Sequence, residues 1–522
     1  MGLLASHPDG TTINPESSYS HHVSTLLFKN HQLDSEKTAL PVKKQAMNKQ
    51  EAESLEMTYS DSFSNSTAEE EPEMIVVGAG ILGAAFAVTM AREGRKVLLI
   101  ERDMKEPDQF AGEVLQPGGY ELLKELDLGE GMEGFDACPV NGYKVEDLKY
   151  KDTITLPLPM SENKLQKNGR SFLHGRFAYS LRKIAMKEPN IKIIEGSVTR
   201  LLEEDGYVIG VLYKEKDTGN VKEVHAPLTL VADGLFSNLR KCLISRKPTV
   251  TSHFTGIILK TPPEWKSTSL ELMLFDTLIV FFYQLSSTET RVMINIKGDL
   301  PRNMRDYLMQ NVYHRVPEVL KEPFVIAVQN DRLKTMPARY FPAVAVDKPG
   351  VLIMGEAYNG RHPLTGGGMS IILNDIKMWR TFLKDIPDLY DDEKIFQAKQ
   401  KFYRLRKDSC TFVVNVLAEV LHGLFTASDE ILLRLRRALF YYCNQSTECA
   451  MGPTLLLAVL STKPMTLIRI LVTVILYAMY LAVKLEPWYA KPRGIYKSAV
   501  ILYQSVAILI PLIYKEIMNL PY

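Results

Sequence analysis

The sequence has few cysteines and almost no net charge. Its 522 residues include five cysteines, which are too scattered for a disulfide framework and form no CxxC pair of the kind that binds zinc. Lys and Arg number 62 and Asp and Glu number 61, so the formal charge is +1. The absence of a basic excess argues against nucleic acid as a main partner. No cluster of metal-ligating side chains stands out, so we expect reduced thiols and no metal.

Long apolar runs are missing from the first 73 residues, where the longest is residues 26–28. Such a segment cannot bury enough surface to offset the entropy lost on ordering, which predicts a disordered polar leader over residues 1–73. No apolar stretch follows the start, so no signal peptide is expected. Residues 1–6 fit the M-G-x-x-x-S myristoylation pattern, although patterns this short also occur by chance.

A complete βαβ unit is predicted from residue 74 onward. Residues 74–77 are a continuous apolar run, typical of a strand that is buried on both faces. The sequence GAGILG is followed by a helical stretch to residue 92 and by a second predicted buried strand at residues 96–100. In this G-x-G-x-x-G fingerprint, Gly78 permits a tight turn, Gly80 lets the backbone approach a pyrophosphate, and Gly83 lets helix and strand pack closely.

The end of the second strand carries Glu101 and Arg102. Glu101 can accept hydrogen bonds from both ribose hydroxyls of an adenosine. Its charge disfavours the 2′-phosphate of NADP, although Arg102 weakens that inference. The fingerprint alone does not distinguish NAD from FAD.

Two later segments favour FAD. Asp233 and Gly234 follow a predicted buried strand, and Glu356 follows another. The second segment continues into a glycine-rich helix start that includes Gly367. Such a segment brings backbone N–H groups and a carboxylate against a polyhydroxy chain and a ring carbonyl, as FAD requires.

The remaining chain divides into a β-rich part and a helical part. Residues 256–259, 278–283 and 292–296 are strand-like, and residues 394–447 have helical periodicity. We therefore expect an α/β fold with a Rossmann-type FAD-binding domain at residues 74–250 and 335–390. A mainly β substrate domain is inserted at residues 251–334, and residues 391–522 form a helical, membrane-associated region.

Apolar stretches crowd the C-terminal region, at residues 454–460, 465–483 and 499–514. The second is near the length that spans a bilayer but contains Arg469, and the third is shorter and contains Pro511. Aromatic and basic residues between them are typical of a headgroup interface. The pattern favours monotopic insertion over spanning, and a buried helical hairpin is the alternative.

The Asp-Gly and Gly-Glu segments resemble the DG and GD motifs of single-component FAD monooxygenases. More specific segments are LQPGGY at 115–120, VNGY at 140–143, HGRF at 174–177, DGLFS at 233–237 and RHPLTGGGM at 361–369. Together with the apolar tail, they resemble the squalene epoxidase (squalene monooxygenase) family from about residue 74 to the end.

This resemblance implies an enzyme that epoxidises squalene to (S)-2,3-oxidosqualene in sterol biosynthesis, using FAD, O2 and a flavin C4a-hydroperoxide. A second dinucleotide fingerprint is missing from the sequence. The implied electron source is therefore NADPH, through a separate flavoprotein reductase. The implied location is the cytosolic face of the endoplasmic reticulum (microsomal) membrane, in contact with lipid.

The resemblance also implies roles for individual residues. Tyr143 matches a tyrosine held near the flavin by a glutamine, here Gln116, and Tyr283 matches an aromatic of the substrate region. Pro363 and Leu364 would lie between flavin ring and substrate. Positions that match FAD contacts are Ile81, Leu82, Glu101, Arg102, Val114, Arg182, Val198 and Met369.

Three features depart from the family pattern. Glu356 stands where the GD motif carries Asp, Gln109 stands where vertebrate relatives have an FAD-contacting Arg, and the leader lacks the apolar segment of those relatives. These departures leave two alternatives open. One is a diverged paralogue with weak or no activity, and the other is an FAD monooxygenase that acts on another lipid.

Overall fold

The computed structural model describes residues 71–110, 112–161, 166–275 and 278–518. Residues 1–70 of the predicted leader lie outside this part of the chain, and so does the myristoylation pattern at residues 1–6.

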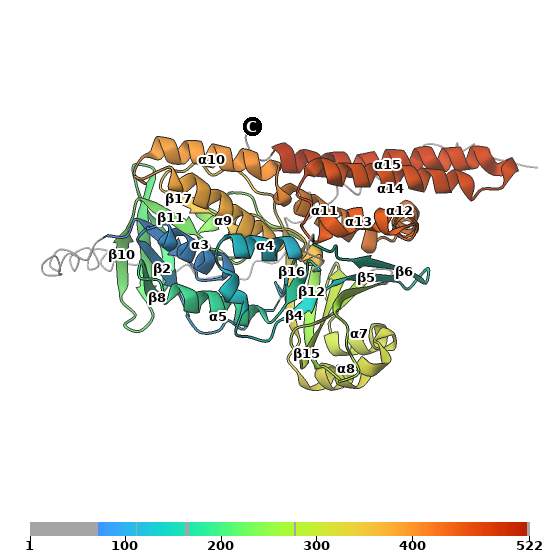
Figure 1. Cartoon of the computed structure of the whole chain (residues 1–522), viewed down its shortest axis with the longest axis horizontal. Coiled ribbons are helices and arrows are strands. Elements are labelled where there is room, and N and C mark those ends of the chain that lie inside the picture. The colour runs from blue at the N-terminus through green and yellow to red at the C-terminus, as the bar shows by residue number, and fades with distance from the viewer. Residues whose placement is uncertain (1–70, 111, 162–165, 276–277, 519–522) are drawn as a thin grey trace, which may run out of the picture. The chain divides into compact units, whose positions relative to one another are not determined.

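The first sheet is built around the predicted βαβ unit, which is confirmed as β1 (Met74–Val77), α3 (Ile81–Arg92) and β2 (Val97–Glu101). All four residues of β1 are buried, as its continuous apolar sequence predicts. The strand order is β10-β9-β8-β2-β1-β11-β17, parallel from β8 to β17 (Figure 1). The further strands are β8 (Ile191–Glu204), β9 (Tyr207–Glu215), β10 (Val221–His225), β11 (Leu228–Val231) and β17 (Val351–Ile353).

Helices pack on this sheet and on one another. Helix α3 lies beside α5 (His174–Ala185) and α9 (Gly368–Lys384), and α9 in turn packs against α4 (Pro117–Glu125) and α10 (Asp392–Lys407). Residues 81–91 of α3 are all buried, so this helix forms the centre of the first hydrophobic core.

The second sheet has the order β16-β12-β15-β14-β13-β5-β6. Its pairs are antiparallel except β13 with β5, which is parallel. Residues 142–157, assigned from the sequence to the FAD-binding part, supply β5 and β6 of this sheet. The strands are β5 (Gly142–Asp147), β6 (Asp152–Pro157), β12 (Thr249–Lys260), β13 (Ser269–Leu274), β14 (Leu278–Gln284), β15 (Glu289–Lys297) and β16 (Lys334–Tyr340).

The second sheet is covered on both faces. Alternate residues of β14 point to opposite sides, so Leu278, Val280 and Phe282 pack with α7 (Met304–Asn311) and α8 (Glu318–Asn330). Ile279 and Tyr283 belong to the opposite core, which contains the C-terminal helices. Burial on both faces explains why residues 278–283 of this strand are all aliphatic or aromatic.

A small third sheet joins β3 (Val114–Leu115), β7 (Gly169–Ser171) and β4 (Cys138–Val140). Short helices complete the described chain: α6 (Arg240–Leu243), η2 (Gly129–Met132), η3 (Tyr313–Arg315), η4 (Gly355–Ala357), η5 (Pro363–Thr365) and η6 (Trp488–Ala490).

The predicted helical region contains α11 (Cys410–Phe425), α12 (Glu430–Cys443), α13 (Thr447–Leu457), α14 (Pro464–Lys484) and α15 (Lys491–Met518). Helices α14 and α15, in red in Figure 1, lie side by side. Helix α15 extends beyond the expected third apolar stretch, residues 499–514, at both ends. Pro511 lies inside this helix and does not end it. Within the described residues, two helical segments, 464–484 and 488–518, are long and apolar enough to cross a membrane, or three if the bent pair α10–α11 counts as one span.

Candidate active site

Three loops meet at the carboxyl ends of the parallel strands β1, β11 and β17. Gly78 has a φ of +98°, and a Cβ added there would lie 2.8 Å from the Ala232 carbonyl oxygen. A Cβ added at Gly355 would lie 2.7 Å from Cδ2 of Leu82. The glycine fingerprint therefore lies directly against the Asp233 segment on one side and the Glu356 segment on the other.

The first turn of α3 has the geometry of a pyrophosphate site. A Cβ added at Gly83 would lie 1.8 Å from the Gly78 carbonyl oxygen, so only glycine allows this close packing of helix and strand. At Gly80, an added Cβ would meet no protein atom within 4 Å, and no side chain caps the helix there. The helix start, with Ile81 and Leu82, thus has unpaired N–H groups and room for an anion beside Gly80.

Glu101 and Arg182 hold the glycine loop in place. Oε2 of Glu101 accepts a 2.7 Å hydrogen bond from the Ala79 N–H, and Nε of Arg182 donates to the Ala79 carbonyl over 2.7 Å. Arg182 also donates to the carbonyls of Asp103 and Lys105. The contacts of Arg182 within the described chain support the loop, so its predicted FAD contact stays a prediction.

The Asp233 and Glu356 segments bring two carboxyl groups to the same region. Oδ1 of Asp233 is buried and has no hydrogen-bond donor among the described residues, and burial raises the pKa of this carboxyl. The Glu356 side chain is exposed. Helix α9 begins after Gly367, and no side chain caps its start. Met369, in the first turn of α9, is buried. The unpaired Oδ1 of Asp233, the exposed Glu356 carboxylate and two uncapped helix starts fit the hydroxyl and phosphate groups of FAD.

Four other predicted FAD positions differ in burial. Val114 is buried in β3, and a Cβ added at Gly366 would lie 3.7 Å from its Cβ. Val198 is half-buried on β8, whereas Arg102 and Gln109 are exposed. Their contacts with FAD stay predictions.

Tyr143 and Gln116 are in direct contact. The Tyr143 hydroxyl donates a 2.6 Å hydrogen bond to Oε1 of Gln116, and Nε2 of Gln116 donates over 2.8 Å to the carbonyl of Thr365. Burial raises the pKa of the Tyr143 hydroxyl well above its usual range, so this group is neutral at all physiological pH values.

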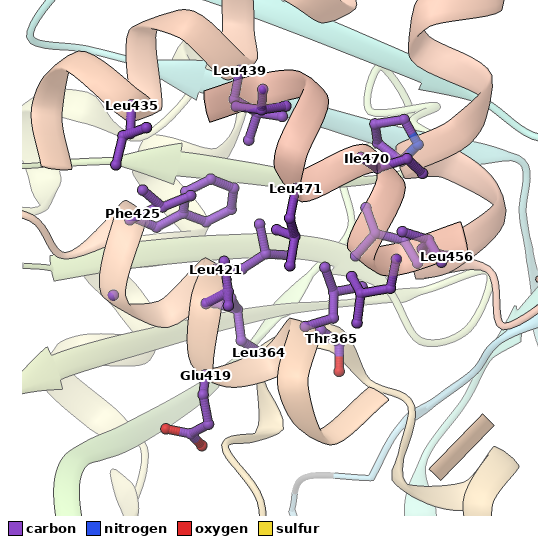
Figure 2. A pocket seen from close by; sticks show the side chains of 18 of the residues that line it. Leu364, Thr365, Glu419, Leu421, Phe425, Leu435, Leu439, Leu456, Ile470 and Leu471 are labelled. Atoms are coloured by element: carbon purple, nitrogen blue, oxygen red, sulfur yellow. The ribbon is translucent and has the colours of Figure 1, made fainter. Parts of the chain in front are cut away.

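An apolar cavity of about 410 Å³ opens from this pair. Leu364 and Thr365 of η5 line it, together with Glu419 of α11 (Figure 2). Figure 2 also shows that its apolar wall comes from several helices, with Leu421 on α11, Leu456 on α13 and Leu471 on α14. The cavity therefore connects the Tyr143 region with the C-terminal apolar helices.

Pro363 and Tyr283 lie outside the described lining of this cavity. The Tyr283 hydroxyl instead donates a 2.9 Å hydrogen bond to Oε2 of Glu113, which also accepts from Nε of Arg291 over 2.8 Å. Glu113 comes directly before Val114, so this buried group ties the second sheet to β3. Sequence reasoning missed Glu113, Arg291 and Glu419, because no local pattern distinguishes them from other charged residues.

The model of the squalene epoxidase family matches residues 225–496, which is more than half of the chain. This chain belongs to the squalene epoxidase family. Squalene monooxygenase of Mus musculus is 54% identical over 446 residues, covering 85% of this chain and 78% of that protein. Squalene epoxidase erg1 of Schizosaccharomyces pombe is 36% identical over 457 residues, covering 86% of this chain and 99% of that protein.

Solved monooxygenase structures share the fold of this squalene epoxidase family member. One is pqsL, a probable FAD-dependent monooxygenase from Pseudomonas aeruginosa, which matches with a TM-score of 0.54 and 16% identity, covering 74% of this chain and 99% of that chain. The p-nitrophenol 4-monooxygenase PnpA from Pseudomonas putida DLL-E4 matches with a TM-score of 0.60 and 15% identity, covering 74% of this chain and 98% of that chain. The model of an NAD(P)-binding Rossmann-like domain matches residues 76–105. The predicted α/β fold class with a Rossmann-type domain is confirmed.

Proposed function

We propose that this protein is an FAD-dependent monooxygenase that epoxidises squalene to (S)-2,3-oxidosqualene with O2. The observation that carries the proposal is the apolar cavity, which runs from Tyr143 and Gln116 to α14 and α15. A C30 hydrocarbon needs an apolar binding site of this kind. The names of the two relatives, squalene monooxygenase and squalene epoxidase, support the same substrate.

Residues at the junction of the two sheets would hold the cofactor. The helix start beside Gly80 would take the pyrophosphate, Glu101 the adenosine ribose, and Asp233 and Glu356 the polar chain of FAD. FAD, when bound and reduced, supplies the activation of O2 that no side chain can supply. The protein's own residues then bind the alkene, orient it and exclude water.

Tyr143 and Gln116 form the polar end of an otherwise apolar cavity. The neutral Tyr143 hydroxyl is directed at Gln116, and Gln116 is fixed through the Thr365 carbonyl. A hydrogen-bonded pair of this kind keeps the polar atoms oriented without placing a charge beside a hydrocarbon. Leu364, which lines the cavity on the same turn, orients the bound chain by contact.

Helices α14 and α15 would insert into one leaflet of the membrane. Their exposed side chains are mostly large and apolar, and Trp488 and Tyr489 between them are 85% and 72% exposed. A cavity bounded by these helices receives squalene from the bilayer, which avoids an aqueous transfer worth about 0.8 kcal/mol per CH2 group. The endoplasmic reticulum membrane, on its cytosolic face, is the proposed location.

Electrons would come from NADPH through a separate flavoprotein reductase. The chain has one dinucleotide fingerprint, which the FAD adenosine would occupy. A reductase in the same membrane would therefore be a partner, together with squalene, O2 and lipid.

A diverged paralogue with weak or no activity is the second candidate, because Glu356 and Gln109 depart from the family pattern. The deciding experiment uses the purified full-length chain in lipid nanodiscs with FAD, NADPH, reductase and squalene. Reductase-dependent 2,3-oxidosqualene, read by mass spectrometry, supports the proposal. Protein that binds FAD but forms no epoxide points to another lipid substrate, and protein that binds no FAD points to the paralogue.

A further inference from the structure

The turn formed by η5 is capped by the side chain of His362. Nδ1 of this imidazole accepts a hydrogen bond from the Leu364 N–H over 3.3 Å. Because Nδ1 acts as the acceptor, the ring proton of neutral His362 resides on Nε2. Nε2 lies 2.9 Å from Oγ of Ser252 and 3.3 Å from Nδ2 of Asn295. With the ring proton on Nε2, the imidazole donates to the Ser252 hydroxyl.

The surroundings of His362 keep the ring neutral and fixed. It is 2% exposed, and its ring stacks on that of His422 with centroids 3.8 Å apart. Oγ of Ser252 also accepts from Nδ2 of Asn295 over 2.8 Å, and Oε1 of Glu419 accepts from the backbone N–H of His362. Burial lowers the pKa of His362 well below its usual range. A protonated ring would lose the Leu364 hydrogen bond, since Nδ1 would become a donor.

The capped turn carries the residues that shape the polar end of the cavity. Leu364 and Thr365 line the cavity, and the Thr365 carbonyl fixes Gln116, which in turn fixes Tyr143. A path of backbone and hydrogen bonds therefore runs from His362 to the Tyr143 hydroxyl. Loss of the cap would remove the acceptor of the Leu364 N–H and let this turn change conformation.

We propose that His362 is a positioning residue, whose neutral imidazole caps the Pro363–Thr365 turn and so keeps Leu364, Gln116 and Tyr143 aligned for the reaction. This inference rests on the proposed epoxidase function for its kinetic test. The cap itself is a property of the protein alone and can be measured without turnover.

Two substitutions separate the functions of the two ring nitrogens. In His362→Asn, the side-chain oxygen takes the place of Nδ1 and still accepts from the Leu364 N–H, but the donor to Ser252 is lost. In His362→Gln, the amide nitrogen takes the place of Nε2, and the acceptor for Leu364 is lost. His362→Ala removes both. His253→Asn, one residue from Ser252 on β12, is the control, because its Nδ1 contacts the Gly298 carbonyl elsewhere.

The kinetic measurement compares kcat and KM for squalene in the full-length holoenzyme with reductase. We expect His362→Asn to keep kcat within about threefold of the parent enzyme, whereas His362→Gln and His362→Ala lower it by about tenfold or more. KM should change less than kcat, because the long apolar wall of the cavity is untouched. Equal losses in the Asn and Gln variants would overturn the proposal.

The second measurement is hydrogen exchange of the peptide covering residues 360–370, in the same solubilised full-length chain. Exchange at Leu364 should be slow in the parent chain and in His362→Asn, and fast in His362→Gln and His362→Ala. Unchanged exchange in all variants would show that the cap does not exist. If the parent enzyme forms no epoxide, the proposed function fails, while the exchange pattern still decides whether His362 caps the turn.

Discussion

Tyr143 and Gln116 join two different sheets through a single 2.6 Å hydrogen bond. Tyr143 lies in β5 of the second sheet, and Gln116 stands at the start of α4, directly after β3 of the third. Both side chains line the apolar cavity, so the bond fixes β5 and the start of α4 to one another at its polar end. Its two partners are 27 residues apart in the sequence.

Removal of the Tyr143 hydroxyl should lower epoxide formation. In Tyr143→Phe, Oε1 of Gln116 loses its donor inside a buried site, which costs about 1–3 kcal/mol and predicts a kcat decrease of about fivefold or more. FAD content should stay unchanged, because the ring still fills its place. Mass spectrometry of the product, with flavin absorbance as the control, checks this. A variant as active as the parent would contradict it.

Two glycines of the fingerprint should respond differently to alanine. Gly80 has an ordinary φ of −69° and open space around an added Cβ, so Gly80→Ala should fold normally but weaken FAD binding by about tenfold or more. Gly83→Ala places its Cβ against a backbone oxygen and should lower the unfolding temperature of the apoprotein. Flavin fluorescence titration and thermal unfolding separate the two effects. Equal FAD affinity in Gly80→Ala would argue against a pyrophosphate at this position.

Shortening Glu356 should strengthen FAD binding. The family motif carries Asp here, and the additional methylene of Glu356 shifts the carboxylate by roughly 1 Å, enough to distort a hydrogen bond. We expect Glu356→Asp to raise FAD affinity several-fold and Glu356→Gln to lower it. The exposed Glu223 on β10 provides the control substitution, Glu223→Asp, which should have no effect on the flavin titration. Weaker binding by Glu356→Asp would indicate that the longer side chain suits this site.

Membrane attachment should depend on the aromatic pair between α14 and α15. Trp488 and Tyr489 are exposed, and replacing both with Ser removes apolar area that we expect to enter the bilayer. Binding to phospholipid vesicles, measured by co-sedimentation, should fall by about tenfold or more. Tyr207→Ser, at an exposed site on β9, is the matched control. Unchanged vesicle binding in the double variant would contradict insertion at this hairpin tip.

Glu419 should make stability fall as the pH rises. Burial raises its pKa from 4.5 to about 7, so the folded chain holds a proton that the unfolded chain releases from about pH 4.5 upward. Stability from this group is present below pH 4.5 and is lost up to about pH 7, a change of at most about 3 kcal/mol. Glu419→Gln keeps an acceptor for the His362 N–H but cannot ionise.

Thermal unfolding of both proteins between pH 5 and pH 8 tests this difference. The unfolding temperature of the parent protein should decrease with pH relative to Glu419→Gln, because other titrating groups are common to both. Parallel curves would show that Glu419 has an ordinary pKa in the folded protein.

Patterns within short stretches of sequence were sufficient to predict the first half of the nucleotide-binding region. The apolar run at residues 74–77, the spacing of Gly78, Gly80 and Gly83, and Glu101 after the next strand are local features. Each reflects a requirement that the backbone meets within one βαβ unit, so β1, α3 and β2 could be placed correctly. The resemblance supplied Tyr143 and Gln116, which periodicity alone would have left in the core.

Only the tertiary structure determined which distant residues form the cavity. Its wall combines Tyr143 of β5 with Leu421 of α11 and Leu471 of α14, and no pattern in the sequence brings these positions together. The pairing of β5 with β13, the contact of Ser252 with His362 and the placement of Glu419 in the same cavity as Tyr143 likewise arise from packing between elements far apart in the sequence. Local sequence determines hydrogen bonding within an element, whereas a cavity depends on how the surfaces of several elements fit together.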